Sequence, residues 1–534
     1  MKALHLLLAL VVVFAIAALG NVALGLAPQP GTAYFESDFD EPLPASVDLG
    51  EAVLHEEGQG HEEAGRGRVL HVRAAAGGPG RVAATIPLDV GPMRGNSVWV
   101  GADLRGQGVS RKPNHWNGVK VMLVIQTPSG TLYPQPDVPV GTFGWGRFAA
   151  VANVPADATA AHLVLGLEEV TGEVWFDNVS VKQRRSLARA PAADPQQPVY
   201  KGHDLPRLRG AMAGHRLTEA DVRHFAEAWN GNVLRWQLTE VSQTPRPLET
   251  YDAWLEEELK YLDRVLAWCR EYGVLVVVDL HSPPGGYVAR GGGYISSYGL
   301  IFQDPTAQAM FIDTWRKIAE RYKGNDVIWG YDLMNEPNDT MLGEGALDWN
   351  QLAQKAAEAI RQIEPDRTLI VEFAYGASGV EHFRPLTVPR CVYSVHVYDP
   401  LNFTHQNVPG VTSATGVHWP GEVDGKHWDK AVLREALQPY VDFAERYRVH
   451  MYVGEFGAIR TAPGDSAARY LADAIAIFED LGWDWTFHAY REWHGWSVEH
   501  AGPMNAPRPA EEPTARQRVI TEAFSANRRP EWAR

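Results

Sequence analysis

The feature that most constrains the fold is a regular alternation of two patterns from about residue 204 to residue 526. Short apolar runs typical of β-strands alternate with longer amphipathic stretches typical of helices. The strand candidates are 208–213, 233–238, 274–280, 327–334, 368–373, 392–398, 451–456 and 483–487. The helical stretches are 218–229, 252–272, 305–322, 348–363, 430–447, 466–481 and 514–526.

Eight strands with helices between most of them, over about 320 residues, predict one closed (β/α)8 barrel, an α/β fold. The competing fold is an open, doubly wound sheet. That fold would carry a glycine-rich fingerprint after its first strand, and this sequence has none there.

A different pattern precedes the barrel. Residues 31–183 consist of short apolar runs separated by Gly, Pro and Asp, without a helical period. This spacing of strand and turn signals predicts an all-β sandwich of antiparallel strands. Residues 184–203 are rich in Pro, Ala and Gln and poor in large apolar residues, so we expect a linker there. The sequence therefore predicts two domains, a sandwich at 31–183 and a barrel at 204–526.

The N-terminus has the pattern of a secretory signal. Lys2 is followed by an apolar run at 6–19 and then by the small residues Gly20, Ala23 and Gly25. The run is shorter than the roughly 20 residues of a typical spanning helix. We expect residues 1–25 to be a signal peptide, no membrane span in the mature protein, and a secreted or periplasmic location. An uncleaved membrane anchor is the alternative, and mass spectrometry of the exported protein would distinguish the two.

Charge and cysteine content exclude several classes of function. The chain has 49 Lys and Arg against 65 Asp and Glu, a formal net charge of −16, so a nucleic-acid partner is not expected. Cys269 and Cys391 each lie alone in an apolar pattern, so we expect both side chains to be buried. The sequence has no Cys/His cluster that would indicate a zinc site. The 18 Trp and 19 Tyr fit core packing and, in part, stacking on sugars.

Polar residues gather where the predicted barrel strands end. They are Arg235, His281, Asn335, Glu336, Glu372, His396, Tyr398 and Glu455. In such barrels the C-terminal ends of the strands carry the chemistry, so these side chains predict an active site at that face.

Two carboxylates from different strands, Glu336 and Glu455, suit glycoside hydrolysis. One carboxyl would protonate the leaving oxygen while the other attacks the sugar or activates water. Arg235 and Tyr398 could keep the attacking carboxylate ionised. Glu372 is the alternative candidate for a catalytic carboxylate. His281 and His396 also fit the role of buried structural histidines. Neither histidine has a partner at metal-ligand spacing, so no metal site is expected.

Four motifs together resemble glycoside hydrolase family 5, a family of retaining (β/α)8 glycosidases. They are DLHSPPG at 279–285, NEP at 335–337, SVHVYDP at 394–400 and GEFG at 454–457. The resemblance covers about residues 203–526 and implies that Glu336 is the acid/base and Glu455 the nucleophile. It further implies a β-linked polysaccharide or oligosaccharide substrate and no cofactor. The supporting residues that it implies are Arg235, His281, Asn335, His396 and Tyr398.

The first domain resembles, more loosely, the jelly-roll carbohydrate-binding modules. The motifs are VWFDNVSV at 174–181 and FESDFDEPLP at 35–44. Such modules often hold a structural calcium ion, which makes Asp177 a candidate ligand. An ordinary polar residue at a strand edge explains Asp177 equally well. Trp116 and Trp145 are the candidates for sugar contact in this domain.

The eighth strand departs from the family pattern. Relatives usually carry a Trp at its end, under the sugar beside the nucleophile, whereas this sequence has His488. We expect a later Trp to supply the stacking face, with Trp493 preferred, or the subsite to be more polar. The full set of candidates for substrate binding is Trp493, His488, Trp496, Trp419 and Tyr287.

The sequence thus predicts an exported enzyme, and the favoured interpretation is a retaining endo-acting β-1,4-glucanase. A β-mannanase and an exo-acting β-glycosidase are alternatives with the same fold. An alternative of another class is a catalytically silent carbohydrate-binding protein, which the paired carboxylates argue against. The sequence leaves the oligomeric state open.

Overall fold

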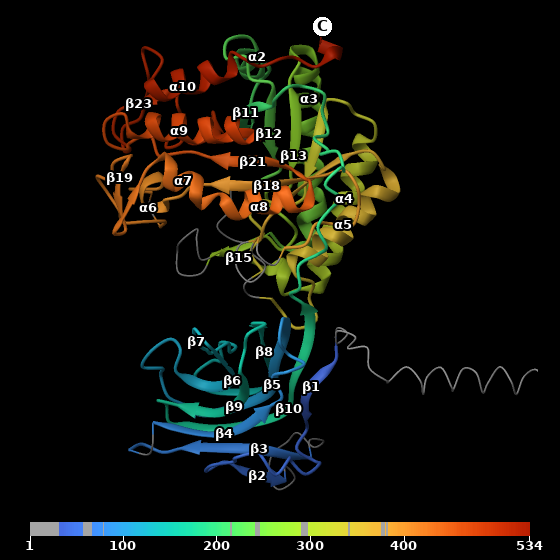
Figure 1. The fold of residues 1–534 in the computed structure, drawn as a ribbon, viewed down its shortest axis with the longest axis vertical. Coiled ribbons are helices and arrows are strands. Elements are labelled where there is room, and N and C mark those ends of the chain that lie inside the picture. The colour runs from blue at the N-terminus through green and yellow to red at the C-terminus, as the bar shows by residue number, and fades with distance from the viewer. Residues whose placement is uncertain are drawn as a thin grey trace, which may run out of the picture. The chain divides into compact units, whose positions relative to one another are not determined.

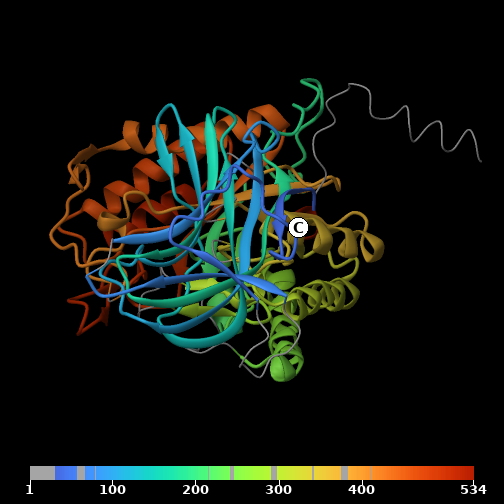
Figure 2. The same cartoon turned by 90° about the horizontal axis from the view of Figure 1, so that it is seen from below.

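The structure is a computed structural model. It describes residues 31–56, 67–77, 80–213, 216–240, 246–289, 297–339, 342–374, 380, 383–408 and 410–533. The expected signal peptide, residues 1–25, lies outside the described residues. The chain divides into two compact units, Met1–Ala188 and Arg189–Arg534. In Figures 1 and 2 the coloured part of the first unit consists of arrows and loops, whereas the second unit also carries coiled ribbons.

The described part of the first unit contains two antiparallel sheets. One has the order β2-β3-β10-β5-β8, with β1 also pairing with β10, and the other has the order β4-β9-β6-β7. The strands are β1 (Ala33–Ser37), β2 (Val53–Glu56), β3 (Arg68–Ala74), β4 (Arg81–Leu88), β5 (Asn96–Val109), β6 (Gly118–Thr127), β7 (Gly130–Leu132), β8 (Gly141–Val154), β9 (Ala160–Glu168) and β10 (Gly172–Ser186).

Buried and more exposed side chains alternate along these strands, and the buried ones form the core of the first unit. In β4, Val82, Ala84 and Ile86 are buried while the residues between them are more exposed, as expected for a strand with one face inward. Leu104 of β5, Leu123 of β6 and Phe176 of β10 belong to the same apolar cluster. This unit therefore has a core of its own.

The second unit contains a closed barrel of eight strands. In order around the barrel they are β11 (Arg209–Ala213), β12 (Val233–Gln237), β13 (Leu275–Asp279), β16 (Ile328–Asp332), β17 (Thr368–Glu372), β18 (Cys391–Val397), β21 (His450–Phe456) and β22 (Asp484–Tyr490). Every neighbouring pair is parallel, and β22 pairs with β11 to close the barrel. Each of the eight predicted strands corresponds to one of these strands.

Helices lie around the barrel strands (Figure 1). They are α2 (Glu219–Glu227), α3 (Leu248–Tyr272), α4 (Pro305–Tyr322), α5 (Trp349–Ile363), α6 (Leu401–Thr404), α7 (Lys430–Ala436), α8 (Gln438–Tyr447), α9 (Ser466–Leu481), α10 (Ala515–Phe524), and the short 3-10 turns η2 (Leu300–Phe302) and η3 (Glu531–Ala533). The described residues of this unit also form small two-stranded sheets: β14 (Tyr287–Ala289) with β15 (Ser297–Gly299), β19 (Gly421–Val423) with β20 (Lys426–Trp428), and β23 (His500–Ala501) with β24 (Arg508–Pro509).

Local sequence signals explain where the helices start and stop. Asp348 caps α5 by accepting from the backbone of Gln351, whose side chain reaches back to the cap. Helix α3 ends at Gly273, which adopts a left-handed conformation with φ of 70°. The single helix predicted over 430–447 is instead two helices, α7 and α8. Pro439 in the first turn of α8 has no N–H to continue the hydrogen bonds of α7.

The predicted linker at 184–203 is corrected by the structure. Strand β10 continues through Ser186, so the first part of that range belongs to the sandwich. The backbone carbonyl of Ala190 accepts from Arg446, and that of Lys201 accepts from the Trp329 indole. The segment is poor in large apolar residues because many of its contacts are hydrogen bonds, both from its backbone and from the side chains of Tyr200 and His203. Most of it is therefore a strap along the barrel.

The strap ends at the face of the barrel where the strands begin. His203 Nε2 lies 2.8 Å from Asp484 Oδ2 and His450 Nε2 lies 2.6 Å from the same oxygen. The Leu208 backbone N–H donates to Asp484 Oδ1 at 2.7 Å. An apolar layer that includes Trp329 and Tyr452 is buried in the same region of the barrel. This face therefore stabilises the fold.

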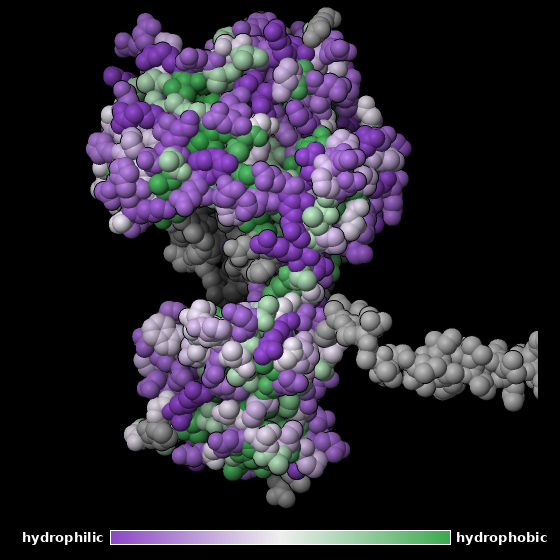
Figure 3. Space-filling model, viewed as in Figure 1, coloured by the Kyte–Doolittle hydropathy of each residue, from purple (hydrophilic) through white to green (hydrophobic). Residues whose placement is uncertain are grey.

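Large apolar side chains of the barrel unit are mostly buried, and the face drawn in Figure 3 is mainly hydrophilic with small apolar patches. In the described part of the chain, no helix combines the length and the hydrophobicity that crossing a membrane requires.

Candidate active site

The polar residues predicted at the strand ends converge at the C-terminal mouth of the barrel. Glu336 follows β16 in a turn where its φ is 42°, a left-handed conformation that is unusual for glutamate. Its backbone N–H donates to Glu372 Oε2 at 2.8 Å, which holds this turn. Its carboxylate accepts from His396 Nδ1 at 2.9 Å, and the side chain is 40% exposed. Glu336 therefore combines a fixed position with access to a ligand.

Glu455 lies near the end of β21 and is almost fully buried, with 5% of its side chain exposed. Arg235 Nη1 donates to its Oε1 at 2.7 Å, and the Tyr398 hydroxyl donates to its Oε2 at 2.8 Å. Oε2 also lies 3.4 Å from Nδ1 of His488. One carboxylate oxygen is thus held by a cation and the other by a hydroxyl.

The electrostatic environment of Glu455 favours its ionised form. Burial by itself would raise the pKa of this carboxyl. The positive charges of His396, His488, Arg235 and His281 outweigh burial and lower the pKa far below its ordinary value. Glu455 is therefore an ionised carboxylate at neutral pH.

Arg235 is the hub of the site. The side chain comes from β12 and is fully buried. Besides Glu455, its guanidinium donates to Asp332 at 2.9 Å, to Glu372 at 2.8 Å and to the Asn335 side chain at 3.1 Å. A buried guanidinium is tolerated only when its donors are paired in this way. Burial would lower its pKa, but the surrounding carboxylates raise that pKa well above the ordinary value.

The two predicted histidines are both close to acids. Burial opposes the charged form of His396, yet Glu372, Glu455 and Glu336 raise its pKa well above the ordinary value. His281 Nδ1 lies 2.8 Å from Asp279 Oδ2. For His281 too, burial lowers the pKa and the charge of Asp279 overcomes it, so the net shift is upward. Both rings therefore favour the imidazolium form.

The predicted pair of carboxylates comes together across the mouth. An oxygen of Glu336 and an oxygen of Glu455 lie within 4.8 Å of each other. A separation of about 5–5.5 Å between carboxyl groups is typical of retaining glycosidases, and about 6.5–9.5 Å of inverting ones. The short separation is suited to a direct attack on the sugar by one of the two groups.

The aromatic candidates differ in position. Trp496 is 7% exposed and packs against His488, with ring centroids 5.2 Å apart, and against Tyr398 at 6.1 Å. Trp493 is half-buried, and its ring centroid lies 6.0 Å from that of Trp496. Both lie in the loop after β22, near the nucleophile candidate.

Trp419, another aromatic candidate, does not form an open stacking face. Trp419 is fully buried, its indole N–H donates to Asp473 at 2.9 Å, and its ring packs on Phe403 and Tyr470. Trp419 was expected to offer a stacking face for sugar, and that expectation is wrong. Its place in a long loop gave no sign that its side chain is part of the core. The side chain of Tyr287 lies outside the described residues.

Sequence reasoning missed four residues that belong to this site. Asp279 and Asp332 surround Arg235, and Glu492 and His405 lie beside His488 and Trp496. The two aspartates precede the chosen residues in the motifs DLH and DLMNEP, so their strand-end position was a usable signal. Glu492 and His405 come from loops, and their positions follow only from the fold.

Asp177 was the candidate calcium ligand. It is buried in β10, where Oδ1 accepts from the backbone N–H of Asn178 at 2.7 Å. Among the described residues, two groups of His, Asp or Glu have the spacing to hold a metal ion, and neither contains Asp177. They are Glu336 with His396 and Glu455, and His203 with His450 and Asp484.

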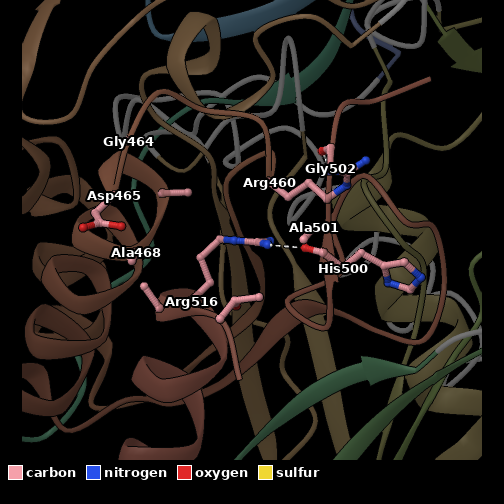
Figure 4. Close-up of a pocket in the computed structure, with 11 residues that line it drawn as sticks. Arg460, Gly464, Asp465, Ala468, His500, Ala501, Gly502 and Arg516 are labelled. Carbon is pink, nitrogen blue, oxygen red and sulfur yellow. Dashed lines mark hydrogen bonds between the residues drawn. The ribbon is translucent and has the colours of Figure 1, made fainter. Parts of the chain in front are cut away.

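A separate cavity of about 240 Å³ lies between the starts of α9 and α10 (Figure 4). Arg460 and Arg516 line it and bind backbone carbonyls of the segment after β22: Arg460 donates to His494, and Arg516 to Ser497 and His500. None of the predicted catalytic residues lines this cavity. Its two arginines anchor the loop that carries Glu492, Trp493 and Trp496.

Comparison with known proteins finds a matching family model, related curated proteins and similar solved structures. A family model described as cellulase (glycosyl hydrolase family 5) matches residues 194–502, more than half of the chain. Endoglucanase C of Acetivibrio thermocellus is 28% identical over 289 residues, which cover 49% of this chain and 81% of that protein. Cellodextrinase A of Ruminococcus flavefaciens is 27% identical over 235 residues, which cover 43% of this chain and 66% of that protein. The crystal structure of endoglucanase Cel5A from the hyperthermophilic Thermotoga maritima aligns with 20% identity and a TM-score of 0.45, covering 59% of this chain and 96% of that one.

Proposed function

Because the chain belongs to glycosyl hydrolase family 5, we infer that it is a glycoside hydrolase that cleaves β-1,4-glucan internally, with retention of configuration. Its curated relatives include endoglucanases and a cellodextrinase. The observation that carries the mechanism is the approach of Glu336 and Glu455 to within 4.8 Å at the barrel mouth.

Glu455 acts as the nucleophile. One of its oxygens forms a bond to the anomeric carbon while the bond to the leaving oxygen breaks, and Glu336 gives that oxygen a proton. Water then attacks the anomeric carbon, Glu336 takes a proton from the water, and the bond to Glu455 breaks. Two displacements at the same carbon return the original configuration.

The surrounding residues support these two roles. Arg235 and Tyr398 donate to the two oxygens of Glu455, which keeps the carboxylate ionised and its orientation fixed. His396 donates to Glu336 and fixes the acid beside the nucleophile. Asn335 accepts from Arg235 and anchors the turn before Glu336. His281, charged beside Asp279, adds to the positive field at Glu455.

We also propose that the first unit is a jelly-roll-type carbohydrate-binding module. Two observations support it: the pair of antiparallel sheets that share a large apolar core, and the exposed side chains of Trp116 and Tyr133, at 52% and 58%. Exposed aromatic rings suit stacking on the apolar face of a sugar. Export of the protein stays a prediction from the N-terminal sequence.

Substitution of the two carboxylates tests the mechanism. Glu455→Gln is expected to lower kcat on the order of 10³-fold or more on every substrate, because no nucleophile remains. Glu336→Gln should cost about 10²–10⁴-fold on polysaccharide but far less on aryl glycosides with good leaving groups, which need little protonation. Azide should restore Glu336→Ala and yield a β-glycosyl azide. The exposed Glu445 on α8 provides the matched control, Glu445→Gln, which should behave as wild type.

Analysis of the reaction products identifies the preferred substrate and the stereochemistry of hydrolysis. A panel of carboxymethyl cellulose, mixed-linkage glucan, mannan and xylan should give the highest kcat/KM on β-1,4-glucan, with oligosaccharides of several lengths early in the reaction. A preference for mannan, or release of a single small product, would move the assignment to a β-mannanase or an exo-acting enzyme. Proton NMR should detect the β-anomer first, and early appearance of the α-anomer would overturn the retaining mechanism.

A further inference from the structure

His488 links the nucleophile candidate to a carboxylate at the rim of the site. It lies in β22 near the end of the strand, where its Nδ1 is 2.6 Å from the Tyr398 hydroxyl. Its Nε2 is 3.0 Å from Glu492 Oε2. Tyr398 in turn donates to Glu455 at 2.8 Å. The four side chains therefore form one continuous hydrogen-bonded chain.

The protonation state of His488 decides which neighbour receives the hydroxyl proton of Tyr398. Tyr398 has one hydroxyl proton and can give it either to Glu455 or to His488. If His488 carries protons on both nitrogens, Nδ1 donates to the Tyr398 oxygen and the hydroxyl proton must go to Glu455. If His488 is neutral with its proton on Nε2 toward Glu492, Nδ1 becomes an acceptor and draws the Tyr398 proton away from Glu455. The other neutral tautomer would set the lone pair of Nε2 against the Glu492 carboxylate.

The groups around His488 favour the doubly protonated ring. Burial opposes its charge, but Glu492 from the loop after β22 and Glu455 from β21 raise its pKa above the ordinary value. His281, after β13, works in the opposite direction. The neighbouring His405, after α6, is itself shifted down to a pKa of about 4 by burial and by His488, so it stays neutral. The Trp496 ring covers one side of the imidazole at 5.2 Å.

Among these four hydrogen-bonded side chains, Glu492 is the one whose charge can be removed with least effect on the others. Its side chain is 28% exposed, and its Oε2 also lies 3.5 Å from the Gln237 amide. Unlike Glu455 it contacts no arginine or lysine in the described structure. Removing its charge therefore changes the protonation of His488 without touching the groups that hold Glu455 directly.

We propose that His488 and Glu492 act as a positioning pair that directs the single hydroxyl proton of Tyr398 onto the nucleophile Glu455. This inference rests on the proposed function, because it assigns Glu455 the nucleophilic role. His488 acts on Glu455 through Tyr398 and through its own charge, 3.4 Å from Oε2, so it is a positioning residue.

The first test compares pH profiles of kcat/KM for the full-length protein on a soluble glucan. In Glu492→Gln, the hydrogen bond to Nε2 remains but the negative charge is lost, so His488 releases its proton at lower pH. We expect the alkaline limb to move down by about one pH unit, with KM changing less than kcat. Glu492→Asp keeps the charge and should restore most of the wild-type profile.

The matched control is Glu422→Gln. Glu422 lies 3.0 Å from His427 on the exposed β19–β20 hairpin, so the change weakens a similar His–Glu contact outside the chain described above. Its profile should coincide with that of wild type. An unchanged alkaline limb in Glu492→Gln overturns the proposal.

The second test observes His488 directly and needs no activity. With imidazole-¹⁵N-labelled histidine, the His488 signals are assigned by their loss in His488→Gln. In wild type both ring nitrogens should have the shifts of an imidazolium at pH 7, and in Glu492→Gln the ring should titrate at lower pH. A neutral His488 at pH 7 in wild type overturns the proposal. If instead the ring titrates as expected while the protein hydrolyses no glycan, the positioning chain stands and the proposed function fails.

Discussion

At the scale of single residues, the site is a nearly balanced cluster of buried charges. Arg235 faces the four carboxyl groups of Asp279, Asp332, Glu372 and Glu455. Burial raises the pKa of Asp332 well above its ordinary value, with help from the charges of Glu372 and Asp279 and against the pull of Arg235. His281 and His396 supply further positive charge. Near-neutrality is what allows so many ionisable groups to share a buried space.

The Tyr398→Phe substitution tests how much the hydroxyl contributes at Glu455. Loss of a hydrogen bond to a charged group costs about 1.5–3 kcal/mol, so kcat/KM should fall by about 10- to 150-fold. The pKa of Glu455 is lowered in the native protein, and without this donor it moves up toward the ordinary value. The acidic limb of kcat/KM should therefore shift to higher pH, because Glu455, the proposed nucleophile, is protonated sooner as pH falls.

Tyr322→Phe is the matched control for Tyr398→Phe. It also removes a buried hydroxyl, which donates to the Leu259 carbonyl at 3.0 Å in the wall of helices. It should lower the melting temperature without moving the acidic limb. If both variants left the limb in place, the Tyr398 hydroxyl would not be acting on the ionisation of Glu455.

At the scale of elements, the loop after β22 is held by a helix. Arg516 on α10 is 8% exposed and donates to the carbonyls of Ser497 and His500, the second contact visible in Figure 4. Burial and the charge of Arg460 lower the pKa of Arg516 to about 10, which remains above any neutral working pH. The two arginines anchor this irregular segment by donating hydrogen bonds to its backbone carbonyls.

Replacing Arg516 by methionine should therefore loosen this loop. Two hydrogen bonds from a charged donor are lost, offset in part by the removal of a buried charge, which leaves a net destabilisation of about 2 kcal/mol. The melting temperature should fall by a few degrees and kcat/KM severalfold, because Glu492 and Trp496 lie on the loop. Differential scanning calorimetry and kinetics on a soluble glucan measure the two effects.

The control for this prediction lies on the same helix. Arg518 is exposed and donates to the Pro513 carbonyl, outside the loop, so Arg518→Met should leave kcat/KM unchanged. A stable Arg516→Met variant with wild-type kinetics would mean that the loop holds its shape without α10.

At the scale of the whole molecule, the barrel unit begins earlier in the chain than composition indicates. The units separate after Ala188, and the strap that follows belongs to the barrel unit. The Tyr200 hydroxyl lies 2.9 Å from the Thr368 hydroxyl, and His203 lies 2.8 Å from Asp484. The pKa of Asp484 would be raised by burial, but His203 and His450 lower it far below the ordinary value. Asp484 therefore stabilises the fold above about pH 4, and this contribution is lost as pH falls further.

Two truncations test this boundary. A fragment starting at Arg189 should fold, hydrolyse soluble glucan like the full chain, and melt close to the barrel transition of the full chain. A fragment starting at Asp204 loses the contacts of Tyr200, Lys201 and His203, which we expect to cost about 2–4 kcal/mol. Urea unfolding, compared at pH 7, measures the difference. Equal stability of the two fragments would show that the strap contributes nothing.

The same fragments examine the role of the first unit. If the sandwich binds polysaccharide, the fragment from Arg189 should lose activity on insoluble cellulose and keep it on soluble glucan. Equal loss on both substrates would indicate that the first unit is a structural partner of the barrel, and no loss on either would remove the support for a binding module.

The sequence by itself determined the repeating architecture of the barrel and the residues at its mouth. Hydrophobic period, caps and turn residues act locally, so the predicted strands and most of the helices correspond closely to the observed ones. A barrel with known strand order also brings strand ends to one face, which explains why the sequence alone was enough to select Arg235, Glu336 and Glu455. The split of 430–447 at Pro439 was equally local and could have been anticipated.

Only the tertiary structure decided which loop and buried side chains join the site. The burial of Trp419, the strap at 190–203 and the approach of Glu492 to His488 depend on contacts between residues far apart in the chain or on loop paths that no periodicity encodes. The direction of each pKa shift was likewise beyond the sequence, because it depends on how many charges surround one buried atom. Chemical identity at strand ends is a local property, whereas the electrostatic state of Glu455 is a sum over elements that only folding brings together.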